Sequence, residues 1–252
     1  SQYSGSLLFS DFDTLNIALE LSGKVIPSEL KEFFNLKKIS SAKGYIDLRL
    51  KMKGILQKKD KYVLWDIFSF DPVADLNFNS FSIGFNNDKV LFKDVNNHLH
   101  ISDTVTADDF AFTFKDHEFL LNGIFMNLPG WLLGKPVTLI GKADVSCRKL
   151  MPEFLLSGTH KSNTTSAKNE AYNFPGDLIL DLDFHIYTLI YKSFEAKNII
   201  GSLSYKPRLL NFKTLNLNSL DGVISGNGFI VQNTDKSFIS KGSFNLEKIN
   251  VN

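Results

Sequence analysis

The stretch that decides the fold is Tyr45–Gly54, which reads YIDLRLKMKG. Its apolar side chains are Ile46, Leu48, Leu50 and Met52, and the charged side chains between them are Asp47, Arg49, Lys51 and Lys53. Successive side chains of a strand point to opposite faces of the sheet, so this alternation predicts a strand with one apolar and one charged face. A strand with one wet face is typical of an antiparallel sheet, because parallel sheets are usually covered on both faces.

The same alternation returns along the chain. In the segment Asp177–Tyr187, one face would carry Leu178, Leu180, Leu182, Phe184 and Ile186, and the other Asp177, Asp181, Asp183 and His185. Shorter copies are Phe110, Phe112 and Phe114, then Leu203 and Tyr205, then Leu215 and Leu217. The segment Asp221–Gly228 predicts a turn, a short strand and a second turn. The sequence therefore predicts a mainly β, antiparallel protein with few helices.

Composition excludes several classes of function. The 252 residues carry 28 Lys and Arg against 27 Asp and Glu, a formal net charge of +1, so no global field favours a nucleic acid partner. No apolar run approaches the length of a membrane-spanning helix. The single cysteine, Cys147, excludes an intramolecular disulfide and a cysteine-built zinc site, and we expect it to be a small buried hydrophobe.

Helix signals are short. Pro27–Leu36 holds a possible cap at Ser28, followed by apolar side chains, and predicts a short helix. A second short helix is predicted near residues 150–156, which include Pro152. The apolar cluster 129–134 lies between helix breakers and is assigned to no element. Residues 158–174 are polar and predict a surface loop.

Two parts of the chain are similar to each other. Ile17–Leu21 followed by Ile26–Leu30 is echoed by Ala143–Cys147 followed by Leu150–Phe154. A second echo places Phe112 and Phe114 on Leu215 and Leu217, and Leu121 on Ile224. These echoes predict two repeated β-units, residues 1–141 with the helix near 27–36, and residues 142–252 with the helix near 150–156 and the polar loop.

The segment Phe212–Val231 resembles the C-terminal region of AsmA-like proteins, where a leucine-alternating strand is followed by a strand of the form Gly-x-x-x-Gly-x-Gly. Phe194–Tyr205 and the two strand-then-helix units also resemble that family, which is related to TamB and to the bridge-like lipid transfer proteins. The resemblance implies a curled, taco-like sheet of repeated β-units whose apolar groove conducts phospholipid acyl chains. It also implies a role in outer-membrane biogenesis and lipid homeostasis.

Members of that family are anchored in the inner membrane of double-membraned bacteria, and most of their length lies in the periplasm. This sequence lacks the anchor, so the resemblance implies a periplasmic segment of a longer protein. The expected partner is a phospholipid or another acyl-chain lipid, with no cofactor. The groove residues would be the alternating apolar side chains Ile46, Leu48, Leu50, Met52, Phe110, Phe112, Phe114, Leu178, Leu180, Leu182, Phe184, Leu215 and Leu217.

Other readings of the same pattern stay open. An apolar face can be covered by the chain's own elements as easily as by hydrocarbon, and alternation does not separate a closed core from a groove. A structural or adhesive β-sandwich of a cell-envelope protein, without a ligand groove, is the main alternative. A carbohydrate-active β-domain is a third class.

Catalytic and metal-binding patterns are weak. His98 and His100 fall on one strand face, but no third ligand stands at a matching position, so a solvated face is expected instead of a metal site. Asp181 and Asp183 are expected on the wet face of one strand. The glycines between Gly222 and Gly228 lack the helix and lysine of a phosphate loop. We therefore expect no active site, no metal and no enzymatic activity.

Overall fold

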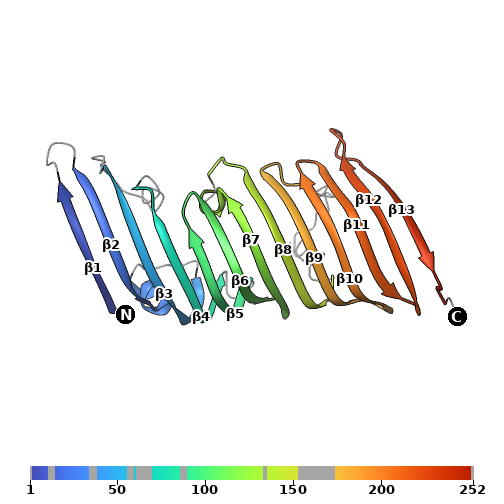
Figure 1. The fold of residues 1–252 in the computed structure, drawn as a ribbon, viewed down its shortest axis with the longest axis horizontal. Helices are drawn as coiled ribbons and strands as arrows, with labels where there is room; N and C mark the ends of the chain where they lie inside the picture. Colours follow the sequence, from blue (N-terminus) through green and yellow to red (C-terminus); the bar gives the residue numbers. More distant parts are fainter. Residues whose placement is uncertain are drawn as a thin grey trace, which may run out of the picture. The chain divides into compact units, whose positions relative to one another are not determined.

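The computed structural model describes residues 2–10, 15–33, 39–55, 60, 70–85, 90–132, 135–152 and 174–250. Their strands form one open sheet of 13 strands in which spatial order follows chain order, from β1 to β13 (Figure 1). The mainly β prediction is confirmed. The chain separates into an N-terminal unit (residues 1–116 and 120–137) and a C-terminal unit (residues 117–119 and 138–252), which are described separately below.

The N-terminal unit is an antiparallel meander. Its strands are β1 (Gln2–Ser10), β2 (Asn16–Val25), β3 (Ile39–Ile55), β4 (Val73–Phe85), β5 (Val90–Ile101), β6 (Thr104–Phe114) and most of β7 (His117–Met126). The alternation of Tyr45–Gly54 lies within β3, as predicted. Register shifts interrupt the β3–β4 pairing near Gly44, whose φ of 75° is readily adopted only by glycine.

The C-terminal unit holds β8 (Leu139–Leu150), β9 (Leu178–Tyr191), β10 (Phe194–Lys206), β11 (Leu209–Ser219), β12 (Gly222–Gln232) and β13 (Phe238–Glu247). Tight turns join the strands from β9 to β13, and non-glycine residues with left-handed backbone occupy them, including Lys192, Arg208, Leu220, Asp221 and Lys236. The predicted strand segments of residues 178–187, 203–205 and 215–217 all lie within these strands.

One pair of strands departs from the antiparallel prediction. β8 and β9 are parallel, with Leu139 opposite Leu178 and Ala143 opposite Leu182. Parallel neighbours need a long crossover, whereas antiparallel neighbours can be joined by a two-residue turn. Residues 151–177 separate the two strands, long enough for that crossover. The alternation of apolar and charged residues in β9 does not reveal the parallel pairing, because a parallel strand can also leave one face exposed to solvent.

The described helices are as short as expected, but one of them, at residues 128–132, lies where no helix was predicted. The predicted helix at Pro27 is α1 (Pro27–Phe33), and its remaining predicted residues fall outside the described ones. The described residues hold a second helix, α2 (Leu128–Leu132), in the apolar cluster that sequence assigned to no element. Leu150 belongs to β8 and Met151–Pro152 are not helical, so the helix predicted there does not start at Leu150. Its remainder and nearly all of the predicted loop 158–174 lie outside the described residues.

The predicted turn after Ile224 is wrong. Ser225–Gly228 lie inside β12, which continues to Gln232. A Cβ built on Gly226 would lie 2.5 Å from Phe244 Cδ1 and 2.4 Å from the Ser243 carbonyl oxygen. Glycine stands here because a neighbouring ring and backbone approach closely, a common reason for glycine within a strand.

The buried apolar residues are mostly small. In the described part of the chain they are Phe70, Ala74, Phe81, Val95, Val105, Ala107, Leu139, Ala143, Cys147, Ala196, Ile199 and Tyr205. Among the described residues no large side chain is fully buried. Many large apolar side chains of the strands are thus only partly buried.

Candidate functional site

The apolar face of the C-terminal unit can be traced from strand to strand by its register. Paired residues of neighbouring strands lie on the same face, and Phe184 is opposite Val145 on β8 and Gly201 on β10. The face continues through Leu215 and Gly226 to Phe244 on β13. Its members are Leu139, Gly141, Ala143, Val145, Cys147, Leu178, Leu180, Leu182, Phe184, Ile186, Ile199, Gly201, Leu203, Tyr205, Leu210, Phe212, Leu215, Leu217, Ile224, Gly226, Gly228, Ile230, Phe238, Ser240, Gly242, Phe244 and Leu246.

No member of this set is charged. The face crosses six neighbouring strands. Ser240, the Tyr205 hydroxyl and the buried Gln232, which is opposite Phe238, interrupt its hydrocarbon. It contains the predicted groove residues Leu178, Leu180, Leu182, Phe184, Leu215 and Leu217, so the register brings these six onto one surface.

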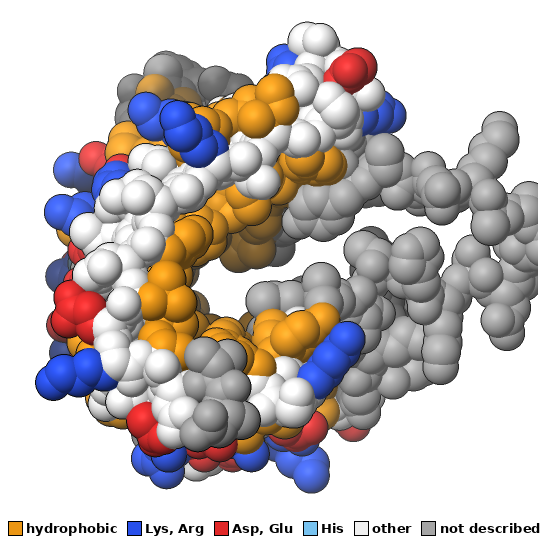
Figure 2. Space-filling view, turned by 90° about the vertical axis from the view of Figure 1, so that its right-hand side faces the viewer, with side chains coloured by type: hydrophobic (Ala, Val, Ile, Leu, Met, Phe, Trp, Pro, Cys, Tyr) orange, Lys and Arg blue, Asp and Glu red, His pale blue; other side chains and the backbone are white. Residues whose placement is uncertain are grey.

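Exposure of the apolar face rises toward β13. Cys147 on β8 and Ile199 on β10 are 2% and 4% exposed, whereas Phe244 and Leu246 on β13 are 56% and 59% exposed. Figure 2 faces the β13 end of the sheet and shows hydrophobic side chains gathered along a hollow, with most Lys, Arg, Asp and Glu side chains on the outer surface. Large apolar side chains are thus left in contact with solvent on the hollowed side.

One end of the apolar face is closed by Phe174. Its ring lies 5.7 Å from the Tyr205 ring and 5.5 Å from the Phe238 ring, both edge-on. The Phe174 backbone N–H donates to Gln232 Oε1 at 3.0 Å, and the Tyr205 hydroxyl donates to the Pro175 carbonyl at 2.8 Å. These contacts fix an aromatic side chain across the ends of β10, β12 and β13.

The N-terminal unit carries an apolar face of its own. Leu50 pairs with Leu21 on β2 and Ala74 on β4, and Leu48 pairs with Gly23 and Leu76. The predicted residues Ile46, Leu48, Leu50 and Met52 lie on this face, together with Tyr3, Gly5, Leu7, Phe9, Ile17, Leu19, Leu21, Val25, Leu76 and Phe78. The register therefore places these four side chains on one face of the unit.

The three predicted phenylalanines of β6 adjoin that face through ring contacts. The Phe110 ring lies 5.4 Å from Phe78, which is opposite Ile46. Phe92 lies 6.0 Å from Phe112 and 5.0 Å from Phe114. Such edge and stacked pairs add to the stabilisation from area burial. Phe92 and Phe114 are direct partners in the β5–β6 register, which sequence spacing alone does not predict.

The opposite face of the C-terminal unit is charged. Lys213 Nζ donates to Asp181 Oδ1 at 2.6 Å across two strands. This hydrogen bond holds the pKa of Asp181 below its ordinary value against the smaller, opposing effect of desolvation. Both side chains are about half exposed, so the pair adds little stability. The predicted wet position of Asp181 is confirmed.

The charged face of the N-terminal unit holds a hydrogen-bonded trio. Asp75 Oδ1 accepts from His100 Nδ1 at 2.8 Å and from His98 Nε2 at 3.1 Å. The bond from His100, followed by that from His98, holds the pKa of Asp75 below its ordinary value. Sequence reasoning placed the two histidines on one face but missed Asp75, because its proximity depends on the β4–β5 register.

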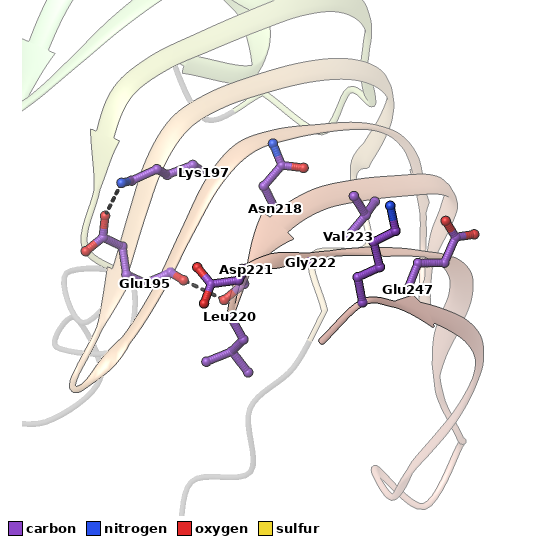
Figure 3. Close-up of a pocket in the computed structure, with 10 residues that line it drawn as sticks. Glu195, Lys197, Asn218, Leu220, Asp221, Gly222, Val223 and Glu247 are labelled. Atoms are coloured by element: carbon purple, nitrogen blue, oxygen red, sulfur yellow. Dashed lines mark hydrogen bonds and ion pairs between the residues drawn. The ribbon is translucent and has the colours of Figure 1, made fainter. Parts of the chain in front are cut away.

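A separate hollow of about 630 Å³ lies at the turn between β11 and β12 (Figure 3). It is lined by charged and polar residues together with Leu220 and Val223, and it includes the ion pair between Lys197 Nζ and Glu195 Oε1 at 3.2 Å. The Ser219 hydroxyl donates to the Glu195 carbonyl at 2.6 Å. None of the predicted groove residues lines this hollow, so it is not part of the apolar faces.

Cys147 lies among the apolar side chains of β8. Burial raises the pKa of its thiol. Its Sγ donates to the Lys149 carbonyl oxygen at 3.3 Å. Its expected role as a small buried hydrophobe is consistent with its 2% exposure. It therefore belongs to the buried part of the apolar face.

No protein-family model, curated protein or solved structure matches this chain. Within the described ranges, no group of three or more His, Cys, Asp and Glu side chains could hold a metal ion. Across the same residues, no helix is long and apolar enough to cross a membrane. The class of protein is therefore defined by the fold itself, an open, mainly antiparallel sheet with apolar and charged faces.

Proposed function

We propose that this protein binds the acyl chains of phospholipids or related lipids along its apolar faces. One observation carries the proposal: the uncharged face that runs across β8–β13 and keeps large apolar side chains exposed at β13. Exposed apolar surface of this extent is typical of interaction sites. A hydrocarbon chain fits this face best, because it has no polar groups that would need hydrogen bonds from the protein.

The dimensions support an acyl chain. Neighbouring strands lie about 4.8 Å apart, so six strands give a face about 24 Å wide. The hydrocarbon core of a bilayer is about 30 Å thick, which gives each acyl chain a length of about 15 Å. One chain would fit within the face, and each methylene removed from water contributes about 0.8 kcal/mol.

The separation of charged and apolar residues supports a binding role without catalysis. A charge on the apolar face would have to be desolvated whenever a hydrocarbon chain lay against it, at a cost of several kcal/mol. Asp181, Lys213 and their neighbours stand on the opposite face, where water solvates them. The proposal therefore assigns no active site to this chain.

The resemblance of Phe212–Val231 to AsmA-like proteins supports a finer proposal. In it the chain is a periplasmic segment of an envelope protein that conducts phospholipid between membranes for outer-membrane biogenesis. The full-length protein would then be anchored in the inner membrane. This part of the proposal depends on sequence resemblance, whereas the lipid-binding part depends on the face.

Lipid extraction from vesicles tests the proposal. Vesicles of phosphatidylethanolamine and phosphatidylglycerol with a trace of fluorescent phospholipid are incubated with the protein and then removed by sedimentation. We expect fluorescent lipid in the supernatant with the wild-type protein. A wild-type protein that is folded but extracts no lipid would contradict the proposal and favour a structural or adhesive role.

Two neighbouring substitutions provide the matched variants. Leu215→Asp places a carboxylate on the apolar face, and Asn216→Asp places the same side chain on the charged face of β11. We expect Leu215→Asp to lose extraction and Asn216→Asp to retain it. Circular dichroism shows whether Leu215→Asp keeps its strand content. If Leu215→Asp unfolds, Leu215→Gln serves in its place, because Gln is polar but uncharged and closer to Leu in size than Asp is.

A further inference from the structure

We propose that the phosphate of a phospholipid binds at the Phe174 end of the apolar face in the C-terminal unit, and that Arg208 holds it. The inference rests on the proposed lipid-binding function and adds a headgroup site and an orientation to it. In the bound state the phosphodiester would lie at Arg208, and the acyl chains would extend from there onto the uncharged face.

Arg208 is held in place by two backbone contacts with β12. It occupies the turn between β10 and β11, one residue beyond the last β11–β12 pair, Leu209 opposite Val231. The Gln232 backbone N–H donates to the Arg208 carbonyl oxygen at 2.8 Å, and Arg208 Nε donates to the Gln232 carbonyl oxygen at 3.0 Å. These bonds continue the β11–β12 ladder by one step and fix the guanidinium beside Gln232.

Gln232 connects this position to the apolar face. It is 4% exposed and is opposite Phe238, a member of that face. Its Oε1 accepts from the Phe174 N–H at 3.0 Å, and the Phe174 ring lies edge-on to the rings of Tyr205 and Phe238. The guanidinium is therefore fixed where the hydrocarbon of the face ends and polar groups begin.

The guanidinium has donors to offer a ligand. An arginine side chain has five N–H donors, and Gln232 takes the one on Nε. Within the described ranges no residue accepts from its two terminal nitrogens, and the side chain is exposed. The carboxylate of Asp235, in the turn between β12 and β13, instead accepts from the N–H and the hydroxyl of Ser237, at 2.9 and 2.6 Å. The paired N–H groups of an arginine match two oxygens of a phosphate.

The two ends of β10–β13 differ in charge, and this difference favours one orientation of the lipid. At the Phe174 end, the segments 206–208 and 233–237 carry three basic residues and one carboxylate. At the other end, the residues that line the hollow in Figure 3 include three acidic residues and two lysines, and one of these lysines, Lys197, is paired with Glu195. A phosphodiester carries one negative charge, so Coulomb attraction favours it at the Phe174 end.

Extraction of two fluorescent lipids tests the site. One is phosphatidylglycerol and the other is diacylglycerol with the same labelled acyl chains, each present as a trace in the vesicles described above. We expect Arg208→Gln to lower extraction of phosphatidylglycerol about three- to tenfold, because a charge-assisted, bidentate contact at an exposed site is lost. Extraction of diacylglycerol, which has no phosphate, should not fall. Comparing variants separately for each lipid removes the difference in their affinity for the vesicle.

Lys206→Gln is the matched control. It removes one positive charge from the same end of the unit, but Lys206 follows Tyr205 in β10 and so points to the charged face. We expect it to extract both lipids as the wild-type protein does. Circular dichroism shows whether Arg208→Gln folds. If it does not, Arg208→Lys takes its place, because it keeps the charge but loses the planar fork, and phosphatidylglycerol extraction should fall at least about twofold.

The outcomes separate this site from lipid binding itself. If Arg208→Gln lowers extraction of both lipids equally, or of neither, the headgroup site is overturned and acyl-chain binding stands. A folded wild-type protein that extracts neither lipid would contradict the proposed function as well. Titration with inorganic phosphate alone, followed by calorimetry, excludes the other source of a phosphate. Saturable binding with a Kd below about 1 mM that is lost in Arg208→Gln would assign the site to free phosphate and overturn the lipid headgroup.

Discussion

Phe184 lies over Gly201 on the neighbouring strand of the C-terminal unit. A Cβ on Gly201 would lie 2.6 Å from Phe184 Cζ and 2.6 Å from the Thr214 carbonyl oxygen. The ring can move, but the backbone oxygen on the other side cannot move without disturbing the β10–β11 pairing. The glycine thus lets an aromatic side chain lie flat along the apolar face, which keeps that face smooth.

Gly201→Ala should therefore destabilise the protein. We expect a loss of about 1–3 kcal/mol, typical of overpacking, measured by urea unfolding. Ser204→Ala on the charged face of the same strand is the matched control and should change stability by less than about 0.5 kcal/mol. Equal stability of Gly201→Ala and wild type would mean that the ring does not lie over this glycine.

Leu50→Asp tests the apolar face of the N-terminal unit. It places an unpaired carboxylate among Leu21, Leu48 and Ala74, and we expect a loss of at least about 2 kcal/mol in thermal or urea unfolding. Lys53→Asp introduces the same side chain on the charged face of the same strand and should be nearly neutral. If Leu50→Asp is as nearly neutral as Lys53→Asp, the side of β3 that carries Leu50 is not a dry apolar face.

The Asp75 trio predicts a pH effect with a definite sign. Because the folded-state pKa of Asp75 is below its ordinary value near 3.9, its contribution to stability is complete above that value. It is lost as the pH falls through the folded pKa. The contribution is small, since the side chain is 41% exposed.

Carboxyl NMR titration measures that pKa directly. We expect His100→Gln to raise the pKa of Asp75 more than His98→Gln does, because His100 donates the shorter hydrogen bond and has the larger effect on it. The double variant should keep the fold. An unchanged Asp75 pKa in both single variants would show that the trio does not form in solution.

Cys147 should react slowly with thiol reagents in the native protein. Its burial limits access and raises the pKa of the thiol, so little of the reactive thiolate is present. We expect rapid labelling in denaturant and slow labelling without it, followed by absorbance. A cysteine at exposed Ser243, in a Cys147→Ala background, is the fast-reacting control. Equal rates would place Cys147 at the surface.

Alternation in the sequence predicted which side chains share a face, because a strand has a fixed period of two. Alternation alone was enough to predict the shared face of Ile46, Leu48, Leu50 and Met52, and that of Leu178, Leu180, Leu182 and Phe184. The parallel pairing of β8 and β9 could not be predicted, since a strand's face pattern is the same in either direction. The β12 glycines were misread as a turn, because glycine marks both turns and close approach of neighbouring groups.

The partners of individual residues were harder to predict than the faces. Asp75 meets His98 and His100 only because β4 and β5 pair in one register, since Asp75 lies 23 and 25 residues before the two histidines. Short helices such as α2 carry too few residues for a periodic pattern. Its Trp131 N–H donates to the Asn127 carbonyl at 2.9 Å, a local contact that composition does not reveal.

Native mass spectrometry of the protein purified from cells, without added lipid, tests the central claim most directly. We expect a population heavier than the bare chain by the mass of one or more acyl-chain lipids, which are identified after extraction. Leu215→Asp should lose this population, and Asn216→Asp should keep it. A folded wild-type protein that carries no lipid and acquires none from vesicles would contradict the account.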